Sequence, residues 1–351
     1  MSKGDADESG TLSPEEAFAV IGNETRIQIL KALCEADRPL GFSELYDRID
    51  YEYTSNFSFH LDKLLGLFVE KSNWAAASPE PQTPNAPPAG VVDETGDQGY
   101  IPTRRGIRIY QAIHSGAVTD DLVIEPSKID RECPFCVEPV YASYWEERLE
   151  RYCKHCDGLY GPASRFNSTT DRAPPDEYGY LGYLRVPPAS VIGRSQSELH
   201  DSTVFAGVVD IITAGNGVCP RCTGNIKRTP WVCHDHDDAD PICSTCHRRY
   251  AAHVEMTCDN CQYLFAPPMS WYLTGFKEVM TVVTDQDLHP IRDVWHWTWD
   301  YEERVRSIEP FDGEFTLNIG DETLTLQIDN DLEIVNAERS PISNRVASDT
   351  D

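Results

Sequence analysis

The sequence predicts an α+β protein with a helical N-terminal third, a cysteine-rich middle and a C-terminal antiparallel sheet. Between residues 13 and 116, apolar residues recur at spacings of three and four, as in helices that pack on a core. Eleven of the 12 cysteines lie between residues 133 and 261, mostly in C-x-x-C pairs. From residue 313, GEFTLNIGDETLTLQIDNDLEIVNAER alternates strictly around two turn signals, which predicts three antiparallel strands.

The N-terminal third is predicted to hold five helices and one hairpin. Ser13 caps the first helix, with Pro14 and two glutamates in its first turn. Three more helices carry the apolar residues of IQILKAL, FSELYDRI and SNFSFHLDKLL, and TRRGIRIYQAIHSG is the fifth. Residues 67–71 and 99–102 are predicted to form the hairpin. The proline-rich segment 75–98 is predicted to be a mobile tip on it, and residues 1–12 a disordered tail.

This order of elements resembles the ArsR-like winged helix-turn-helix transcriptional regulators. The likeness is carried by IGNETRIQILKAL, FSELYDRI, TSNFSFHLDKLLGLFVEK and YIPTRRG, within about 100 of the 351 residues. It implies a winged helix over residues 13–122, whose helix from Thr54 to Leu65 enters the major groove of double-stranded DNA. It also implies a homodimer formed by the helices at 14–22 and 103–115, and a pseudo-palindromic operator. The cysteine pair of the family's metal sensors is missing, so Cys34 is interpreted as a buried small hydrophobe.

The candidate DNA contacts follow from the apolar face of the fourth helix. If Phe57, Leu61 and Leu64 face the core, the outward positions carry small hydrogen-bonding groups that can read base edges. The basic residues of the hairpin and of the next helix would meet phosphates. Residues 13–116 nevertheless hold nine basic and fifteen acidic residues, so counterion release contributes little to binding. The predicted DNA-binding residues are Thr54, Ser55, Asn56, Ser58, His60, Lys63, Lys71, Arg104 and Arg105.

The first two cysteine pairs predict a zinc ribbon in residues 123–170. CPFC at 133–136 and CKHC at 153–156 can turn four thiolates toward one ion, and the chain between them is long enough for a hairpin. The predicted ligands are Cys133, Cys136, Cys153 and Cys156.

Two pairings are open for the ligands of the second zinc-binding module, residues 171–351, whose paired ribbons span 215–266. The favoured serial pairing joins Cys219, Cys222, Cys233 and His236 in one site and Cys243, Cys246, Cys258 and Cys261 in the next. The nested pairing joins the first and last C-x-x-C pairs and encloses the other four ligands; His234 in place of His236 is a variant. In each case the sites are closed and rich in thiolate, which predicts three structural zinc ions and no catalytic one.

The remaining segments are predicted to pack around the ribbons. Residues 196–214 and 269–283 are expected to be helices. Trp295, Trp297 and Trp299 stand at every second position, which favours a strand packed on a neighbouring helix; an aromatic box for a ligand is the alternative. The C-terminal part is similar to modules that follow winged helices in haloarchaeal regulators.

The acidic composition says more about the host organism of the protein than about its binding partner. The chain has 30 basic and 58 acidic residues, and only eight of the basic ones are lysines. Such surfaces are typical of a halophilic archaeon, where molar salt shortens the screening length to about 3 Å. No apolar run spans a bilayer and the first residues lack a signal-peptide core, so a cytoplasmic protein without a membrane partner is expected. The common catalytic motifs are missing, which favours a protein that is not an enzyme.

These observations predict a DNA-binding transcriptional regulator. Its winged helix would read the operator, and its zinc-stabilised C-terminal half would sense a signal or contact a protein partner. The alternative is a zinc-stapled protein-interaction adaptor that does not bind DNA specifically.

Overall fold

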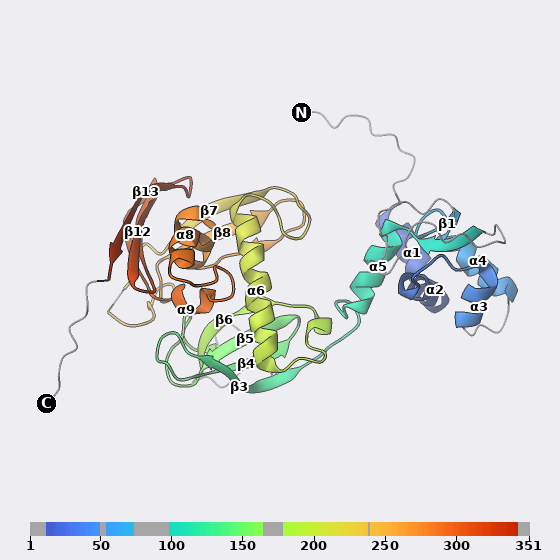
Figure 1. Cartoon of the computed structure of the whole chain (residues 1–351), viewed down its shortest axis with the longest axis horizontal. Coiled ribbons are helices and arrows are strands. Elements are labelled where there is room, and N and C mark those ends of the chain that lie inside the picture. Colours follow the sequence, from blue (N-terminus) through green and yellow to red (C-terminus); the bar gives the residue numbers. More distant parts are fainter. Residues whose placement is uncertain (1–11, 50–53, 74–97, 164–177, 238, 343–351) are drawn as a thin grey trace. The chain divides into compact units, whose positions relative to one another are not determined.

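The computed structural model of the chain describes residues 12–49, 54–73, 98–163, 178–237 and 239–342. These residues form two compact units, 1–120 and 121–351, with helices and four small antiparallel sheets (Figure 1). The predicted mixed α+β class is therefore confirmed. The predicted disordered tail and the predicted mobile tip at 75–98 fall almost wholly outside the described residues. Within the described part, no helix is both long and apolar enough to cross a membrane.

The N-terminal unit contains the five predicted helices and the predicted hairpin. Its elements are α1 (Pro14–Ile21), α2 (Glu24–Glu35), α3 (Phe42–Ile49), α4 (Thr54–Leu64), β1 (Val69–Asn73), β2 (Gln98–Pro102) and α5 (Arg104–His114). Ser13 caps α1 in a reciprocal capping box with Glu16, as its sequence indicates. The core is built mainly from α2 and α4, because Ile29 and Leu30 of α2 and Phe57 and Leu61 of α4 are fully buried.

The TRRG segment fixes α5 against the start of the hairpin. The Thr103 hydroxyl accepts a hydrogen bond from the Gly106 backbone N–H at 3.2 Å and donates one to the Leu67 carbonyl at 2.9 Å. A Cβ on Gly106 would lie 2.2 Å from the carbonyl oxygen of Phe68. Only glycine permits this approach, which explains why a glycine stands inside the first turn of a helix.

The C-terminal unit consists of three antiparallel sheets and the helices between them. Its first part holds β3 (Ile124–Glu132), β4 (Pro139–Trp145), β5 (Arg148–Cys153), β6 (Gly179–Arg185), η3 (Pro188–Ser190) and α6 (Gln196–Gly215). The middle part holds β7 (Ile226–Val232), β8 (Ala252–Cys258), β9 (Leu264–Phe265), α7 (Met269–Tyr272), η4 (Leu273–Gly275), α8 (Lys277–Asp285) and α9 (Val294–Trp297). The last part is the meander of β10 (Tyr301–Ile308), β11 (Phe311–Ile319), β12 (Glu322–Ile328) and β13 (Ile334–Pro341).

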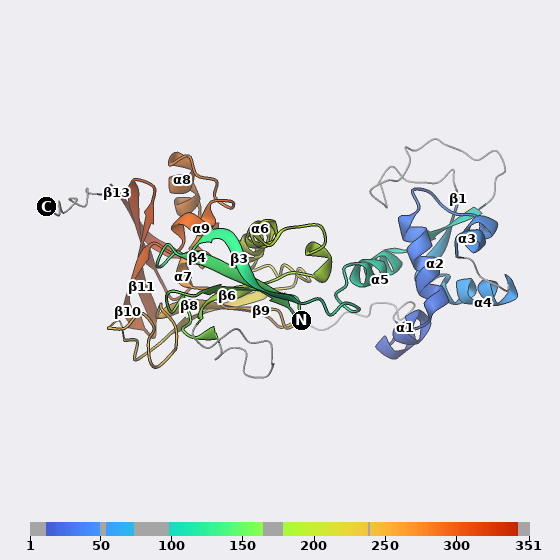
Figure 2. The same cartoon turned by 90° about the horizontal axis from the view of Figure 1, so that it is seen from below.

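One hydrophobic core connects these parts, from Ile129 in β3 to Leu332 after β12. Helix α6 lies along β6, β7 and α7, and it crosses the unit in Figure 1. Its Gly207 faces β6 so closely that an added Cβ would lie 2.9 Å from Leu184 Cδ2. Figure 2 shows the meander against the last helices, where α8 contacts β12 and α9 contacts β11. The core thus takes side chains from both predicted zinc modules.

The strand predicted over the three tryptophans is wrong. Val294–Trp297 is the short helix α9, and Thr298 follows it with its hydroxyl bonded to the Val294 carbonyl at 2.8 Å. Trp295, Trp297 and Trp299 are all buried. Spacing by two indicated a strand with one buried face, but this segment is enclosed on several sides, so helical residues on different faces are all covered.

The predicted three-stranded C-terminal sheet has a fourth strand. Strands β11, β12 and β13 match the prediction, and β10 pairs with β11 from Tyr301 to Ile308. The charged sequence of β10 lacks the apolar alternation that predicts a strand, because Glu303 occupies an inward position. Its carboxylate accepts hydrogen bonds from the backbone N–H groups of Ala251 and Ala252.

Candidate metal centres and nucleic-acid interface

Four of the five C-x-x-C pairs share one backbone geometry. At Cys133, the backbone N–H donates to the Glu138 carbonyl at 2.7 Å, and the carbonyl accepts from the Val137 N–H at 2.9 Å. The same two bonds occur at Cys219, Cys243 and Cys258. The residue after each second cysteine has a positive φ: Val137 (63°), Thr223 (57°), His247 (58°) and Gln262 (59°). Non-glycine residues adopt this conformation mainly where the surroundings demand it, as in a ligand clamp.

The first predicted ribbon has its four ligands together. Cys133 follows β3 and Cys153 ends β5, while β4 pairs with both strands and brings the two turns to one end of the sheet. The Sγ atoms of Cys133 and Cys156 are 3.6 Å apart, and those of Cys136 and Cys153 are 3.4 Å apart. This ligand set was predicted from spacing alone and is confirmed as a cluster.

The donor atoms fit a tetrahedral metal ion. Zinc–sulfur bonds of about 2.3 Å in a tetrahedron place sulfur atoms roughly 3.8 Å apart. In each of three clusters, all ligand atoms lie within 4.8 Å of one another. A disulfide would need a sulfur–sulfur distance of about 2.05 Å, and the cysteines are free thiols. The described residues therefore form three sites that can hold a metal ion, and their thiolate-rich donor sets suit zinc.

The favoured serial pairing of the later ligands is wrong, and the nested pairing is right. Cys219 and Cys222 cluster with Cys258 and Cys261, whereas Cys233 and His236 cluster with Cys243 and Cys246. The cause is the antiparallel pairing of β7 with β8, from Ile226 opposite Cys258 to Val232 opposite Ala252. A seven-residue strand is about 20 Å long, so ligands before and after β7 cannot share an ion.

The two nested clusters have the contacts expected of ligand sets. In one, the Sγ atoms of Cys219 and Cys261 are 3.5 Å apart and those of Cys222 and Cys258 are 3.6 Å apart. In the other, Cys246 Sγ lies 3.5 Å from His236 Nδ1. His234 is exposed and is outside the cluster, which removes the variant with that residue as ligand.

Hydrogen bonds to sulfur favour the thiolate at two of the ligands, Cys222 and Cys243, whereas burial raises the pKa of Cys153 to about 11 and that of Cys246 to about 12. The Asn260 side-chain amide donates to Cys222 Sγ at 3.3 Å and lowers the pKa of that thiol to about 6. Backbone N–H groups, first that of Cys246, lower the pKa of Cys243 to about 6. Cys34 lies outside the clusters and is half-buried, and burial and then Glu35 raise the pKa of its thiol to about 12. A protonated thiol fits a small hydrophobe, but the side chain is only partly covered and not buried as predicted.

Paired substitutions can test the nesting. We expect Cys219→Ser with Cys258→Ser to lose one metal ion per chain, because both residues belong to one cluster. Cys219→Ser with Cys233→Ser should lose two, because the two residues belong to different clusters. Native mass spectrometry of the full chain counts the ions, and Cys34→Ser is the matched control that keeps them all. Loss of two ions by the first double variant and of one ion by the second would contradict the nesting and support the serial pairing.

The predicted DNA contacts on helix α4 are not equally exposed. Asn56 and Lys63 are exposed and Ser58 is half-buried, while the side chains of Thr54 and Ser55 lie outside the described ones. His60 is not in the fully outward position expected of it. It is half-buried, and burial and the nearby Arg26 lower the pKa of its imidazole.

Phe59 occupies the outward position that sequence reasoning missed. Its side chain is 55% exposed, with the Lys63 ammonium 5.4 Å from the ring centroid and the His60 ring edge-on at 5.6 Å. The only signal in the sequence was that Phe59 falls outside the spacing of the buried residues Phe57, Leu61 and Leu64. An exposed phenyl ring on such a helix can contact a thymine methyl group.

Some exposed cations of the N-terminal unit form ion pairs with carboxylates and others do not. Arg38 and Arg48 both form ion pairs with Glu44, at 2.7 and 3.2 Å. Among the described residues, Lys63, Lys71 and Arg104 form no ion pair with a carboxylate. Lys71, Arg104 and Arg105 are exposed, as expected of phosphate contacts.

Two family models match the chain. The model of the domain of unknown function DUF7351 matches residues 130–334, which is more than half of the chain and contains all three metal clusters. The model of a second domain of unknown function, DUF7347, matches residues 14–75, from α1 to the end of β1. No curated protein and no solved structure matches the chain.

Proposed function

The chain belongs to the family of the domain of unknown function DUF7351, and from the residues of its two units we propose that it is a DNA-binding transcriptional regulator. The N-terminal unit is an ArsR-like winged helix in this proposal, with α4 as the helix that enters the major groove. The C-terminal unit is a zinc-stabilised body that senses a signal or contacts a protein partner.

The exposed face of α4 is the single observation that carries the proposal. Phe57, Leu61 and Leu64 are fully buried on one side, while Asn56 and Lys63 are exposed on the other. An amide can make a two-point hydrogen bond to adenine, and an ammonium can contact a guanine edge or a phosphate. Phe59, an exposed phenyl ring on the same helix, adds an apolar group that could contact a thymine methyl.

The net charge of the N-terminal unit favours DNA recognition through base contacts over non-specific electrostatic attraction to phosphates. Residues 13–116 carry nine basic and fifteen acidic residues, a net charge of −6. In dilute salt this charge repels the phosphates. In molar salt the repulsion between charges more than about 3 Å apart is largely screened. Base contacts and DNA shape then decide affinity. The proposal therefore places the protein in a salt-rich cytoplasm, such as that of a halophilic archaeon.

Three zinc ions have a structural role in the C-terminal unit under this proposal. Each cluster has four protein ligands, so an ion bound there keeps no position for water or a substrate. The ions tie the ends of β3, β5, β7 and β8. A unit held in this way offers a stable surface for a signal molecule or a second protein.

A homodimer would complete the DNA-binding form. Phe18 on α1 and Val118, four residues after the end of α5, are each 75% exposed, so apolar side chains are uncovered on the first helix and just beyond the last one. Burying them against a second copy would remove apolar area from water. Two recognition helices would then read two half-sites about 34 Å apart, and the operator would be pseudo-palindromic.

Selection from a random pool of DNA duplexes tests the proposal. The full chain, in about 2 M KCl, is expected to enrich a short two-fold symmetric motif. The Asn56→Ala variant should enrich a weaker motif with one or more positions relaxed, and Gln28→Ala, exposed on α2, should enrich the wild-type motif. No enrichment by the wild-type chain at low or high salt would contradict the proposal and favour the adaptor.

A further inference from the structure

Arg151 in β5 is a buried cation that has no counter-ion among the residues described by the structure. Only 4% of its surface is exposed, and its Nε and Nη1 atoms have no hydrogen-bond partner. Nη2 donates weakly to the Leu181 carbonyl at 3.5 Å, and the guanidinium lies 5.2 Å from the Trp295 ring. No carboxylate of the described residues forms an ion pair with it. A guanidinium stays charged in a protein, so this arrangement is strongly unfavourable unless an anion joins it.

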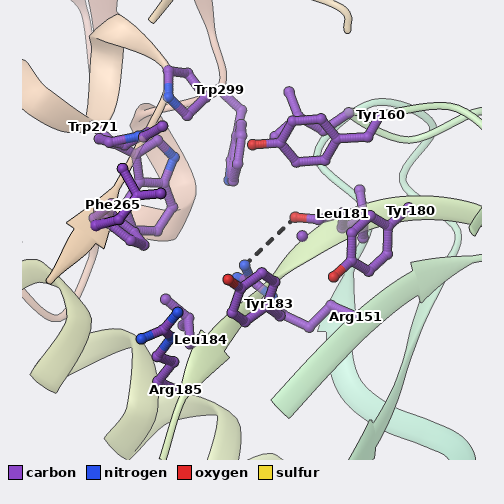
Figure 3. A pocket seen from close by; sticks show the side chains of 16 residues that line it. Arg151, Tyr160, Tyr180, Leu181, Tyr183, Leu184, Arg185, Phe265, Trp271 and Trp299 are labelled. Carbon is purple, nitrogen blue, oxygen red and sulfur yellow. Dashed lines mark hydrogen bonds between the residues drawn. The ribbon is translucent and has the colours of Figure 1, made fainter. Parts of the chain in front are cut away.

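The guanidinium lines a cavity of about 240 Å³ within the C-terminal unit. In Figure 3 it lies beside Tyr183, while Trp299 and Tyr160 form the wall across from it and Trp271 and Phe265 stand at one side. Apart from Arg151 and Arg185, the labelled side chains are aromatic or leucine. The cavity therefore combines one buried positive charge with walls that suit an apolar body.

Strand pairing keeps the space over the guanidinium open. Gly182 in β6 is the residue directly opposite Arg151 in β5. A Cβ on Gly182 would lie 3.7 Å from Arg151 Nη2 and 3.2 Å from Tyr160 Cε2, and the residue has a φ of +91°. A glycine inside a strand often marks a place where a ligand approaches closely.

The unused polar atoms around the cavity are donors. The indole Nε1 atoms of Trp271 and Trp299 are buried and, like Arg151 Nε and Nη1, have no hydrogen-bond partner. An indole or guanidinium N–H can only donate. Buried donors without acceptors are unusual. Together with the positive charge they favour a ligand that has negatively charged oxygen atoms as acceptors.

We propose that this cavity binds a small organic carboxylate with one ring or a branched aliphatic chain. A carboxylate matches the two-pronged donor geometry of a guanidinium, and its apolar body would pack on the tryptophan and tyrosine rings. A cavity of about 150 Å³ holds benzene, so this one has room for a ring and a carboxylate. An inorganic anion would satisfy Arg151 but leave the aromatic walls without a partner.

Calorimetric titration of the full chain tests the inference without DNA, so its outcome is independent of the proposed operator binding. The probes are acetate, isovalerate, benzoate and phenylacetate, with phenylacetamide as the uncharged match, in low KCl and in about 2 M KCl. We expect isovalerate, benzoate or phenylacetate to bind more tightly than acetate and phenylacetamide. The absence of binding by all four carboxylates, equal binding of the amide, or binding that does not depend on the apolar body would overturn the inference.

Three variants locate the site. Arg151→Met should weaken carboxylate binding more than about 30-fold, because it removes a buried charge that pairs with the ligand. Its thermal midpoint without ligand should be equal to or above that of the wild type, since the variant also removes an unpaired buried charge. Ala266→Phe, which fills the cavity and keeps Arg151, should block binding as well. Arg304→Met, exposed on β10, is the control for loss of one positive charge and should bind normally. Unchanged binding by Ala266→Phe, or by a folded Arg151→Met, would place the carboxylate elsewhere and refute the assignment.

Discussion

Removal of the metal ions is expected to unfold the C-terminal unit while α1–α5 keep their helices. All twelve ligands belong to residues 121–351, and none belongs to the N-terminal unit. A structural zinc ion contributes about 10–16 kcal/mol to folding in small zinc domains. A whole domain is stable by only about 5–15 kcal/mol. The loss of even one ion can therefore exceed the stability of the unit.

Circular dichroism during chelation measures this effect. The near-ultraviolet signal of the buried tryptophans of the C-terminal unit should collapse, while part of the helical far-ultraviolet signal remains. Restoring zinc should restore the near-ultraviolet signal. A metal-free chain that keeps this signal would contradict the role given to the ions.

Local spacing was enough to predict much of this molecule. Two cysteines separated by two residues converge whatever surrounds them, so CPFC and CKHC identified the first cluster. Spacings of three and four identified α2 and α4 through Ile29, Leu30, Phe57 and Leu61, and the capping signal of Ser13 marked the start of α1. These features depend on neighbours in the sequence.

One error, the strand predicted over the three tryptophans, is an error of local structure, and the others concern contacts between distant residues. Spacing alone allowed two pairings of the later cysteines, and only the register of β7 with β8 decides between them. The cavity around Arg151 had no sequence signal for the same reason. Gly182 stands opposite Arg151 through strand pairing, and Trp271 and Trp299 come from much later segments. His60 was placed outward from the helical repeat, but its neighbour Arg26 lies on another helix.

Replacing Asn56 with alanine is expected to weaken the discrimination between the operator and other DNA. Asn56 is the exposed amide of α4, and a two-point amide contact with adenine is worth about 1–3 kcal/mol. This corresponds to roughly a 5- to 150-fold loss of affinity for the selected duplex. Binding to unrelated duplexes should change little, because phosphate contacts do not involve this side chain. Gln28→Ala changes an exposed amide on α2 and should leave both affinities unchanged.

Fluorescence anisotropy in about 2 M KCl tests most directly whether α4 reads base edges. The measurement compares the Kd for the selected duplex with the Kd for a duplex of scrambled sequence, for the wild type and for Asn56→Ala. We predict that the wild type prefers the selected duplex by about 10³-fold or more and that Asn56→Ala reduces this preference by roughly 5- to 150-fold. A wild-type chain that binds the two duplexes equally, or an Asn56→Ala variant with the full preference, would contradict the claim.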